Sequence, residues 1–284
     1  MKSEMKTEMK IGQMRVGVWL YGLATIATGV VDIVWREFEA SHQPIKALAQ
    51  HIPGEQALAV LAGIWLVAAG IAILWRPAAR IGAAASALLY LIFALSWLPR
   101  FSAMTHQFGL RIGVILFVLG AVAQQLLLVS PAAIIYATNP PSDAVSQERA
   151  ATIARWMLGL PPITFGLGHL INLPVYGRFV PHWVPFGLFW VVLTGTAFLL
   201  AGCAIITKIQ DVLAARMLAL MLFLFEFIVE IPPVFAHPRS QAAWGGAVYN
   251  LTAIGACWIF AEFARGRSAR QNEIDLAEHF ATAD

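Results

Sequence analysis

Charged side chains are scarce in this chain: 12% of its 284 residues are charged, whereas 59% are hydrophobic. A water-soluble domain needs polar residues to cover its surface, so this balance excludes an ordinary soluble globular fold. The net charge of +3 is small, and no basic, aromatic-interleaved surface indicates nucleic acid as a partner. The composition therefore predicts a protein that lies in a lipid bilayer.

Cysteine is also rare, and familiar catalytic motifs are missing. The two cysteines, Cys203 and Cys257, lie in apolar stretches and are too few for a disulfide framework. The sequence contains no glycine-rich phosphate loop, no zinc-type pair of CxxC motifs and no GxSxG motif. At this level the sequence leaves open whether the protein is an enzyme.

Apolar runs near the ~20 residues needed to cross a membrane recur along the whole chain. They predict an all-α polytopic membrane protein with about eight transmembrane helices, at 16–35, 57–75, 80–98, 109–130, 155–173, 186–206, 213–231 and 243–264. The first run is too long for the apolar core of a signal peptide, so it is predicted to be a span. An outer loop is expected at 36–56, with a short interfacial helix at 44–51.

The distribution of basic residues predicts the orientation of the chain. With the N-terminus inside, 13 of the 19 Lys and Arg residues lie on the cytoplasmic side and 6 on the outer side. Because cytoplasmic loops are enriched in Lys and Arg, both termini are expected in the cytoplasm. The expected location is a cytoplasmic membrane of the bacterial type.

Glycines recur at matching positions in the two halves of the chain. The pairs are Gly22 with Gly159, Gly29 with Gly166, Gly63 with Gly195, Gly70 with Gly202, and Gly120 with Gly255. Generic close helix packing is an alternative explanation for any single pair, but an ordered series favours a duplication. An even number of helices per copy makes the repeats parallel, related by an axis along the membrane normal. The expected units are four-helix bundles at 1–137 and 153–284, joined by a cytoplasmic linker at 138–152.

The same positions carry a resemblance to a known family, the DoxX-like four-helix membrane proteins. The residues that carry it are Arg15, Gly22, Gly29, Pro53, Gly63, Gly70 and Arg80 in the first half, and Arg155, Gly159, Gly166, Pro185, Gly195, Gly202 and Arg216 in the second. The resemblance covers nearly the whole chain as a tandem duplication. It implies a helical bundle that is sometimes associated with quinone-linked oxidation of sulfur compounds. No catalytic motif of the family carries over residue by residue.

Ionisable residues inside a membrane are unfavourable, which makes them candidates for function. Counted at ~1.5 Å per residue from the arginines at the cytoplasmic helix ends, several polar side chains reach one layer in the outer half of the membrane. The candidate ligand-binding residues are His169, Asn172, Glu226, Glu230, Asn250 and, in the first half, Asp32. Because the first half is largely apolar at matching positions, one principal site is expected in the second bundle.

Each candidate also has a purely structural interpretation. Glu226 can be a protonated group that links helices by a hydrogen bond, and His169 can be a packing residue. A divalent metal on Glu226, Glu230 and His169 would have few ligands, so no metal site is assigned. Three functions stay open: a quinone- or lipophile-binding subunit of an oxidoreductase with a soluble redox partner, a transporter of a small solute or proton, and a structural membrane partner.

Overall fold

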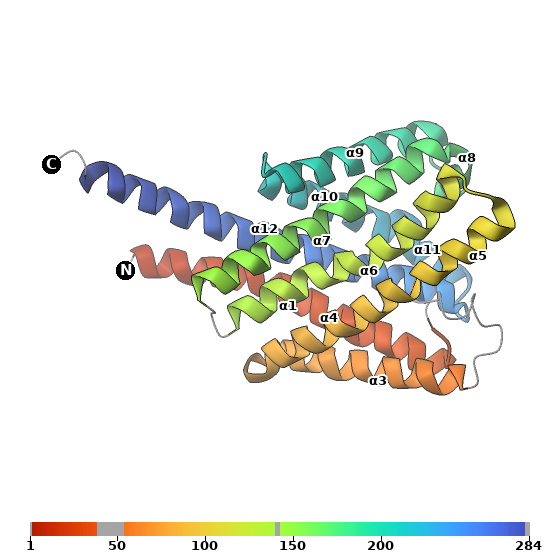
Figure 1. Cartoon of the computed structure of the whole chain (residues 1–284), viewed down its shortest axis with the longest axis horizontal. Coiled ribbons are helices and arrows are strands. Elements are labelled where there is room, and N and C mark those ends of the chain that lie inside the picture. The colour runs from red at the N-terminus through yellow and green to blue at the C-terminus, as the bar shows by residue number, and fades with distance from the viewer. Residues whose placement is uncertain (1, 39–53, 140–142, 282–284) are drawn as a thin grey trace.

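The computed structural model describes residues 2–38, 54–139 and 143–281, and this part of the chain contains helices and no strand. The long helices run alongside one another, and both termini lie at the same end of the molecule (Figure 1). The all-α prediction is therefore confirmed for the described residues. The interfacial helix predicted at 44–51 lies outside them.

The part of the chain that the structure describes consists of long helices and short helical turns. They are α1 (Lys2–Trp35), α3 (Glu55–Leu74), η2 (Arg76–Ala78), α4 (Ala79–Ser96), α5 (Leu98–Phe108), α6 (Ile112–Thr138), α7 (Ala144–Ile171), α8 (Leu173–Tyr176), η3 (Gly177–Phe179), α9 (Gly187–Thr207), α10 (Asp211–Phe225), η4 (Glu226–Glu230), α11 (Ile231–Ala236) and α12 (Gln241–Ala281).

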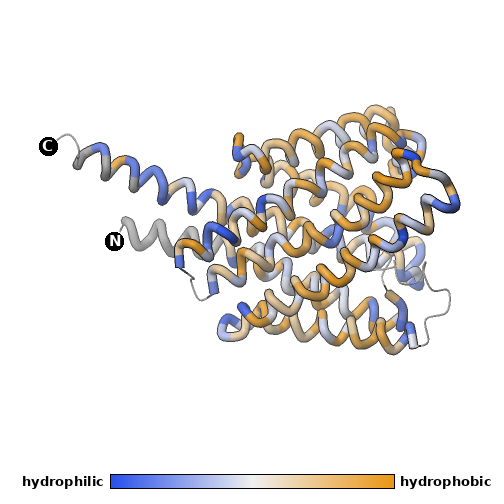
Figure 2. Tube along the Cα trace, viewed as in Figure 1, coloured by the Kyte–Doolittle hydropathy of each residue, from blue (hydrophilic) through white to orange (hydrophobic). Residues whose placement is uncertain are grey.

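Among the described residues, seven stretches of helix are long and apolar enough to cross a membrane. An eighth candidate is α7 together with Leu173–Phe179, which meet at a bend of 98°. Large apolar side chains face outward on these helices, where Leu61 is 60% exposed, Ile81 72% and Leu200 66%. Figure 2 shows hydrophobic residues along the long helices and hydrophilic ones gathered at their ends. Lipid chains are the surroundings that fit such a surface.

The eight long elements pack in chain order and close on themselves. α1 packs against α3 and α12, and the other neighbours are α3 with α4, α4 with α6, α6 with α7, α7 with α9, α9 with α10, and α10 with α12. Two tandem four-helix bundles were expected. In the structure α6 packs along α7 and α12 along α1, so helices of the two halves pack directly against each other. Gly255 permits this approach, because a Cβ there would lie 2.8 Å from the backbone nitrogen of Tyr21.

Glycines make the closest helix contacts in both halves. The contacts are Gly29 with Gly63 and Gly22 with Gly70 between α1 and α3, and Gly166 with Gly195 and Gly159 with Gly202 between α7 and α9. A Cβ on Gly63 would lie 2.6 Å from the carbonyl oxygen of Gly29, and one on Gly166 would lie 2.6 Å from that of Gly195. The remaining predicted pair differs: Gly255 touches Tyr21, but nothing lies within 4 Å of a Cβ on Gly120.

Helix α7 begins earlier than the predicted span. Asp143 caps it by accepting a hydrogen bond from the backbone nitrogen of Ser146 at 2.9 Å, and this bond holds the pKa of the Asp143 carboxyl below its usual value. Part of the expected linker is thus helical. Pro161 and Pro162 therefore lie inside α7, not in its first turns as predicted, and Pro131 lies inside α6.

Candidate functional site

The segment Glu226–Glu230 is a π-helical turn inserted between α10 and α11. Its hydrogen bonding follows from the sequence, because Pro232 and Pro233 have no backbone N–H to continue an α-helix. The Ile231 N–H donates instead to the carbonyl oxygen of Glu226, five residues back. Such turns are rare in proteins, and those that are found frequently lie at functional sites. The two glutamates of the predicted site are the first and last residues of this turn.

Glu226 is 3% exposed and faces α12. The Asn250 side-chain nitrogen donates to its carboxyl oxygen at 2.8 Å, and to the carbonyl oxygen of Leu222 at 2.8 Å. The hydrogen bond replaces part of the hydration that burial removes from the carboxyl group. The structure thus brings Glu226 and Asn250 together.

Glu230 lies one turn further along and faces the same helix. A Cβ at Gly246 would collide with a carboxyl oxygen of Glu230, so the carboxyl group occupies the space left by this glycine. Gly246 is one turn from Asn250 on α12, just as Glu230 is one turn from Glu226. The two glutamates therefore form a short polar row along one helix interface.

His169 lies in a different group of side chains. Its Nδ1 is 2.7 Å from the carbonyl oxygen of Phe165, and since a carbonyl only accepts, Nδ1 carries the proton. The imidazole stacks on the ring of Tyr176 with centroids 3.9 Å apart. The Phe198 ring of α9 lies 5.4 Å from it and 6.2 Å from the ring of Phe225.

His169 therefore contacts a different set of side chains from the two glutamates. Within the described residues, no hydrogen bond or ion pair links His169 to Glu226 or Glu230. The physical reason is the packing order: α9 lies between α7 and α10, and its Phe198 bridges His169 to the residue before Glu226. Counting residues along each helix predicts how deep a side chain lies in the membrane, but it does not predict which neighbouring helix the side chain faces.

Asn172 ends α7 at the 98° bend and lines a pocket of about 340 Å³. The pocket lies between α5–α6 and α7–α8, and its lining residues are Met104, Phe108, Gly113, Val114, Leu116, Phe117, Gly168, Asn172, Val175 and Tyr176. Asn172 and Tyr176 supply the polar side chains of this lining. Among the described residues, the Asn172 side chain makes no hydrogen bond, so its amide is available to a ligand.

Asp32 occupies a matching place in the first half. It is fully buried on α1, and its Cβ lies 3.2 Å from the position of a Cβ on Gly63. The Cβ of His169 lies in the same way against Gly195, at 2.8 Å. The two residues thus sit against equivalent glycines, although one is acidic and the other an imidazole.

The interior of the first half is more polar than the sequence indicated. Its buried polar side chains are Tyr21, Thr25, Thr28, Asp32, Ser86, Tyr90, Gln125 and Ser130. The Tyr21 hydroxyl donates to the carbonyl oxygen of Leu128 at 2.9 Å, which ties α1 to α6. A polar residue inside an apolar span, such as Gln125, could have indicated this polar interior from the sequence.

Ion pairs gather on helices of the second half, and sequence reasoning missed them. Arg155 pairs with Asp211 at 2.8 Å, and Arg216 pairs with Glu262 at 3.0 Å. Arg265 also pairs with Glu262, whose side chain is 3% exposed. These pairs link α7 to α10 and α10 to α12, so they have a structural role. The ion pairs could have been predicted from the acidic residues that lie near the arginines at the ends of the spans.

The described residues hold no group of three or more His, Cys, Asp or Glu side chains that could bind a metal ion. No family model, curated protein or solved structure matches this chain. The functional interpretation consequently depends on the geometry of the two polar groups and on the pocket beside Asn172.

Proposed function

We propose that this chain is a DoxX-like protein of a bacterial-type cytoplasmic membrane, built by tandem duplication, with both termini in the cytoplasm. The duplication is supported by the corresponding glycine contacts of α1 with α3 and of α7 with α9. The orientation is supported by the excess of Lys and Arg on the side of the termini, which lie at one end of the molecule (Figure 1).

In this proposal the protein binds a lipophilic carbonyl compound, and the resemblance favours a quinone. The observation that carries the proposal is the pocket of about 340 Å³ between α5–α6 and α7–α8. Its walls are apolar apart from Asn172 and Tyr176, and small-molecule sites typically combine such walls with few polar groups. Residues from both halves line it, so the site depends on their association.

The polar side chains have separate roles in this site. The Asn172 amide can donate a hydrogen bond to a carbonyl oxygen, which would orient the ligand ring. The Tyr176 hydroxyl is a second donor on the same wall. His169 stacks on the Tyr176 ring and so holds its orientation. Phe108 and Phe117 provide apolar surface for the flat faces of the ring.

When bound, a quinone would supply reversible two-electron chemistry. The sequence contains no motif for a flavin, haem or iron–sulfur cluster that could exchange those electrons. We therefore propose that the chain acts as the membrane subunit of an oxidoreductase whose redox partner is a soluble protein. The chain's own residues would bind and orient the ligand and keep bulk water away from it.

A second candidate, movement of a proton or small solute, is favoured by one observation. Glu226 is a buried carboxyl group in a π-helical turn, hydrogen-bonded to Asn250. Intramembrane carboxyl groups commonly belong to proton relays. Proteoliposomes that contain a pH-sensitive dye test this candidate, which predicts a proton flux that Glu226→Gln abolishes.

The quinone proposal is tested by filling the pocket. Gly113 lines it, and nothing lies within 4 Å of a Cβ placed there, so Gly113→Leu adds bulk to open space. Gly120 is the matched control, because it lies on the same helix, is equally open and does not line the pocket. Binding of a short-tailed benzoquinone to protein in nanodiscs is measured by equilibrium dialysis.

We expect Gly113→Leu to weaken benzoquinone binding by about tenfold or more, because its side chain takes the ligand's place. Asn172→Leu should weaken binding about two- to tenfold, the usual net value of one hydrogen bond. Gly120→Leu should bind like the wild type. Wild-type protein that does not bind the benzoquinone, or a Gly113→Leu variant that binds it normally, would overturn the proposal.

A further inference from the structure

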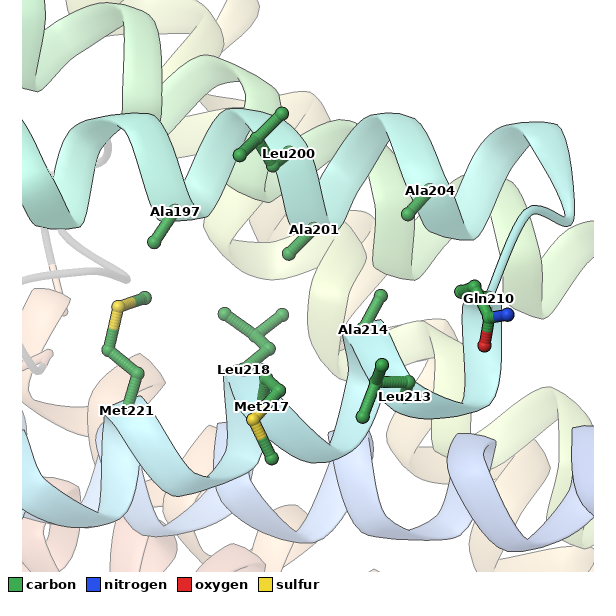
Figure 3. Close-up of a pocket in the computed structure, with 10 residues that line it drawn as sticks. All are labelled: Ala197, Leu200, Ala201, Ala204, Gln210, Leu213, Ala214, Met217, Leu218 and Met221. Atoms are coloured by element: carbon green, nitrogen blue, oxygen red, sulfur yellow. The ribbon is translucent and has the colours of Figure 1, made fainter.

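A second cavity is an apolar groove of about 380 Å³ between α9 and α10 (Figure 3). Its lining residues are Ala197, Leu200, Ala201, Ala204, Gln210, Leu213, Ala214, Met217, Leu218 and Met221. Gln210 is the polar member, and it lies at one end of the row (Figure 3). Both helices belong to candidate membrane spans, and the lining residues Leu200, Leu213 and Met217 are more than half exposed, so lipid would have access to the groove.

The corresponding helices of the first half, α3 and α4, pack closely and leave less space. A Cβ on Gly82 would lie 2.6 Å from the backbone nitrogen of Ile73, so this glycine lets α4 approach α3. The Trp65 indole extends across the same interface and donates to the carbonyl oxygen of Ala85 at 2.9 Å. One glycine and one large side chain therefore close the gap between these helices.

Both features are replaced in the second half. By the spacing that relates Arg80 to Arg216, Leu218 stands at the position of Gly82. By the spacing that relates Gly63 to Gly195, Ala197 stands at the position of Trp65. Leu218 projects between α10 and α9, and Ala197 is too small to fill the space beside it (Figure 3). The groove is thus a consequence of two identifiable changes in the sequence.

The size of the groove favours a hydrocarbon chain as its occupant. A dry cavity of ~150 Å³ accommodates a benzene molecule, so about 380 Å³ has room for a longer chain of carbon atoms. A second helix, with a diameter of ~10 Å, could only lie across the opening. The methionines Met217 and Met221 add flexible side chains that adapt to a chain of variable shape.

The polar end of the groove selects the headgroup. Gln210 lies there, and the exposed Lys208 is two residues away in the turn that joins α9 to α10. The acidic residue of this turn, Asp211, is already paired with Arg155 at 2.8 Å. We propose that the groove binds one acyl chain of an anionic phospholipid, with the phosphate beside Lys208 and Gln210. This turn lies at the same end of the molecule as the termini (Figure 1).

The test gives α9 and α10 the closer packing seen between α3 and α4. Ala197→Trp introduces the side chain that fills the equivalent space at Trp65, and Ala204→Leu fills the groove nearer its polar end. Thr196→Trp is the matched control, because Thr196 is exposed on the same helix but does not line the groove. Native mass spectrometry of detergent-purified protein measures binding of dioleoyl phosphatidylglycerol, with dioleoyl phosphatidylcholine for comparison.

We expect the wild type and Thr196→Trp to retain phosphatidylglycerol. Both filled variants should bind it at least about tenfold more weakly. Lys208→Gln should remove the preference for phosphatidylglycerol over phosphatidylcholine. Equal lipid binding by Ala197→Trp, Ala204→Leu and the wild type would overturn the proposal. So would a change in oligomeric mass without a change in bound lipid, which would make the groove a protein interface. Benzoquinone binding should be unchanged in all of these variants, so this test fails or succeeds independently of the quinone site.

Discussion

Replacing Asn250 with leucine should destabilise the protein through Glu226. The Asn250 amide makes two hydrogen bonds of 2.8 Å, one to the Glu226 carboxyl and one to the carbonyl oxygen of Leu222. A hydrogen bond contributes ~0.5–1.5 kcal/mol net, and those between membrane helices average ~0.6 kcal/mol. The substitution also leaves a buried carboxyl oxygen without this donor, which costs ~1–3 kcal/mol. We expect the free energy of unfolding to fall by about 1–3 kcal/mol.

Glu226→Gln should change the free energy of unfolding much less, by about 0.5 kcal/mol, because glutamine keeps an oxygen that accepts from Asn250. Unfolding in mixed micelles, followed by circular dichroism, measures both variants. Thr252→Val is the control on the same helix, since the Thr252 hydroxyl donates to the carbonyl oxygen of Val248 in its own helix. The reasoning is refuted if Asn250→Leu is as stable as the wild type, or if a double-mutant cycle of Asn250→Leu with Glu226→Leu shows no coupling.

Further predictions concern the repeat, the orientation and the ion pairs. Gly29→Val and Gly166→Val should each lower the free energy of unfolding by about 1–3 kcal/mol, because both crowd a facing backbone; unequal effects would argue against equivalent packing. A cytoplasmic reporter should be active when fused within 138–150 and inactive after Arg239, and activity after Arg239 would reverse the topology. Glu262→Gln should raise the sensitivity to thermal unfolding, because two arginines lose a buried partner; an unchanged melting temperature would contradict this role.

The positions of several apolar helices could be predicted from the sequence. The span expected at 186–206 corresponds to α9 at Gly187–Thr207, and the one at 57–75 corresponds to α3 at Glu55–Leu74. Such predictions succeed because span length depends on local hydropathy and membrane thickness. Apart from Gly120, the paired glycines likewise lie at close helix contacts, since glycine permits a short distance between backbones.

The candidate site was predictable only in part. Depth along the helices placed Glu226 and Asn250 in one layer, and in the structure a hydrogen bond of 2.8 Å joins them. Depth alone also associated His169 with them, but the ring of Phe198 on α9 lies beside His169 and toward Phe225. The direction in which each residue faces depends on how every helix is rotated and which neighbours it has.

By itself, then, the sequence determined an all-α chain with about eight apolar spans, the glycines of its close contacts and the polar residues inside it. Tertiary structure alone decided that the halves close on each other, that Asn172 lines a pocket with Tyr176, and that Leu218 and Ala197 open a groove between α9 and α10. The physical reason is that hydropathy is a property of single segments. Cavities and polar contacts depend instead on side chains of several helices that meet only after packing.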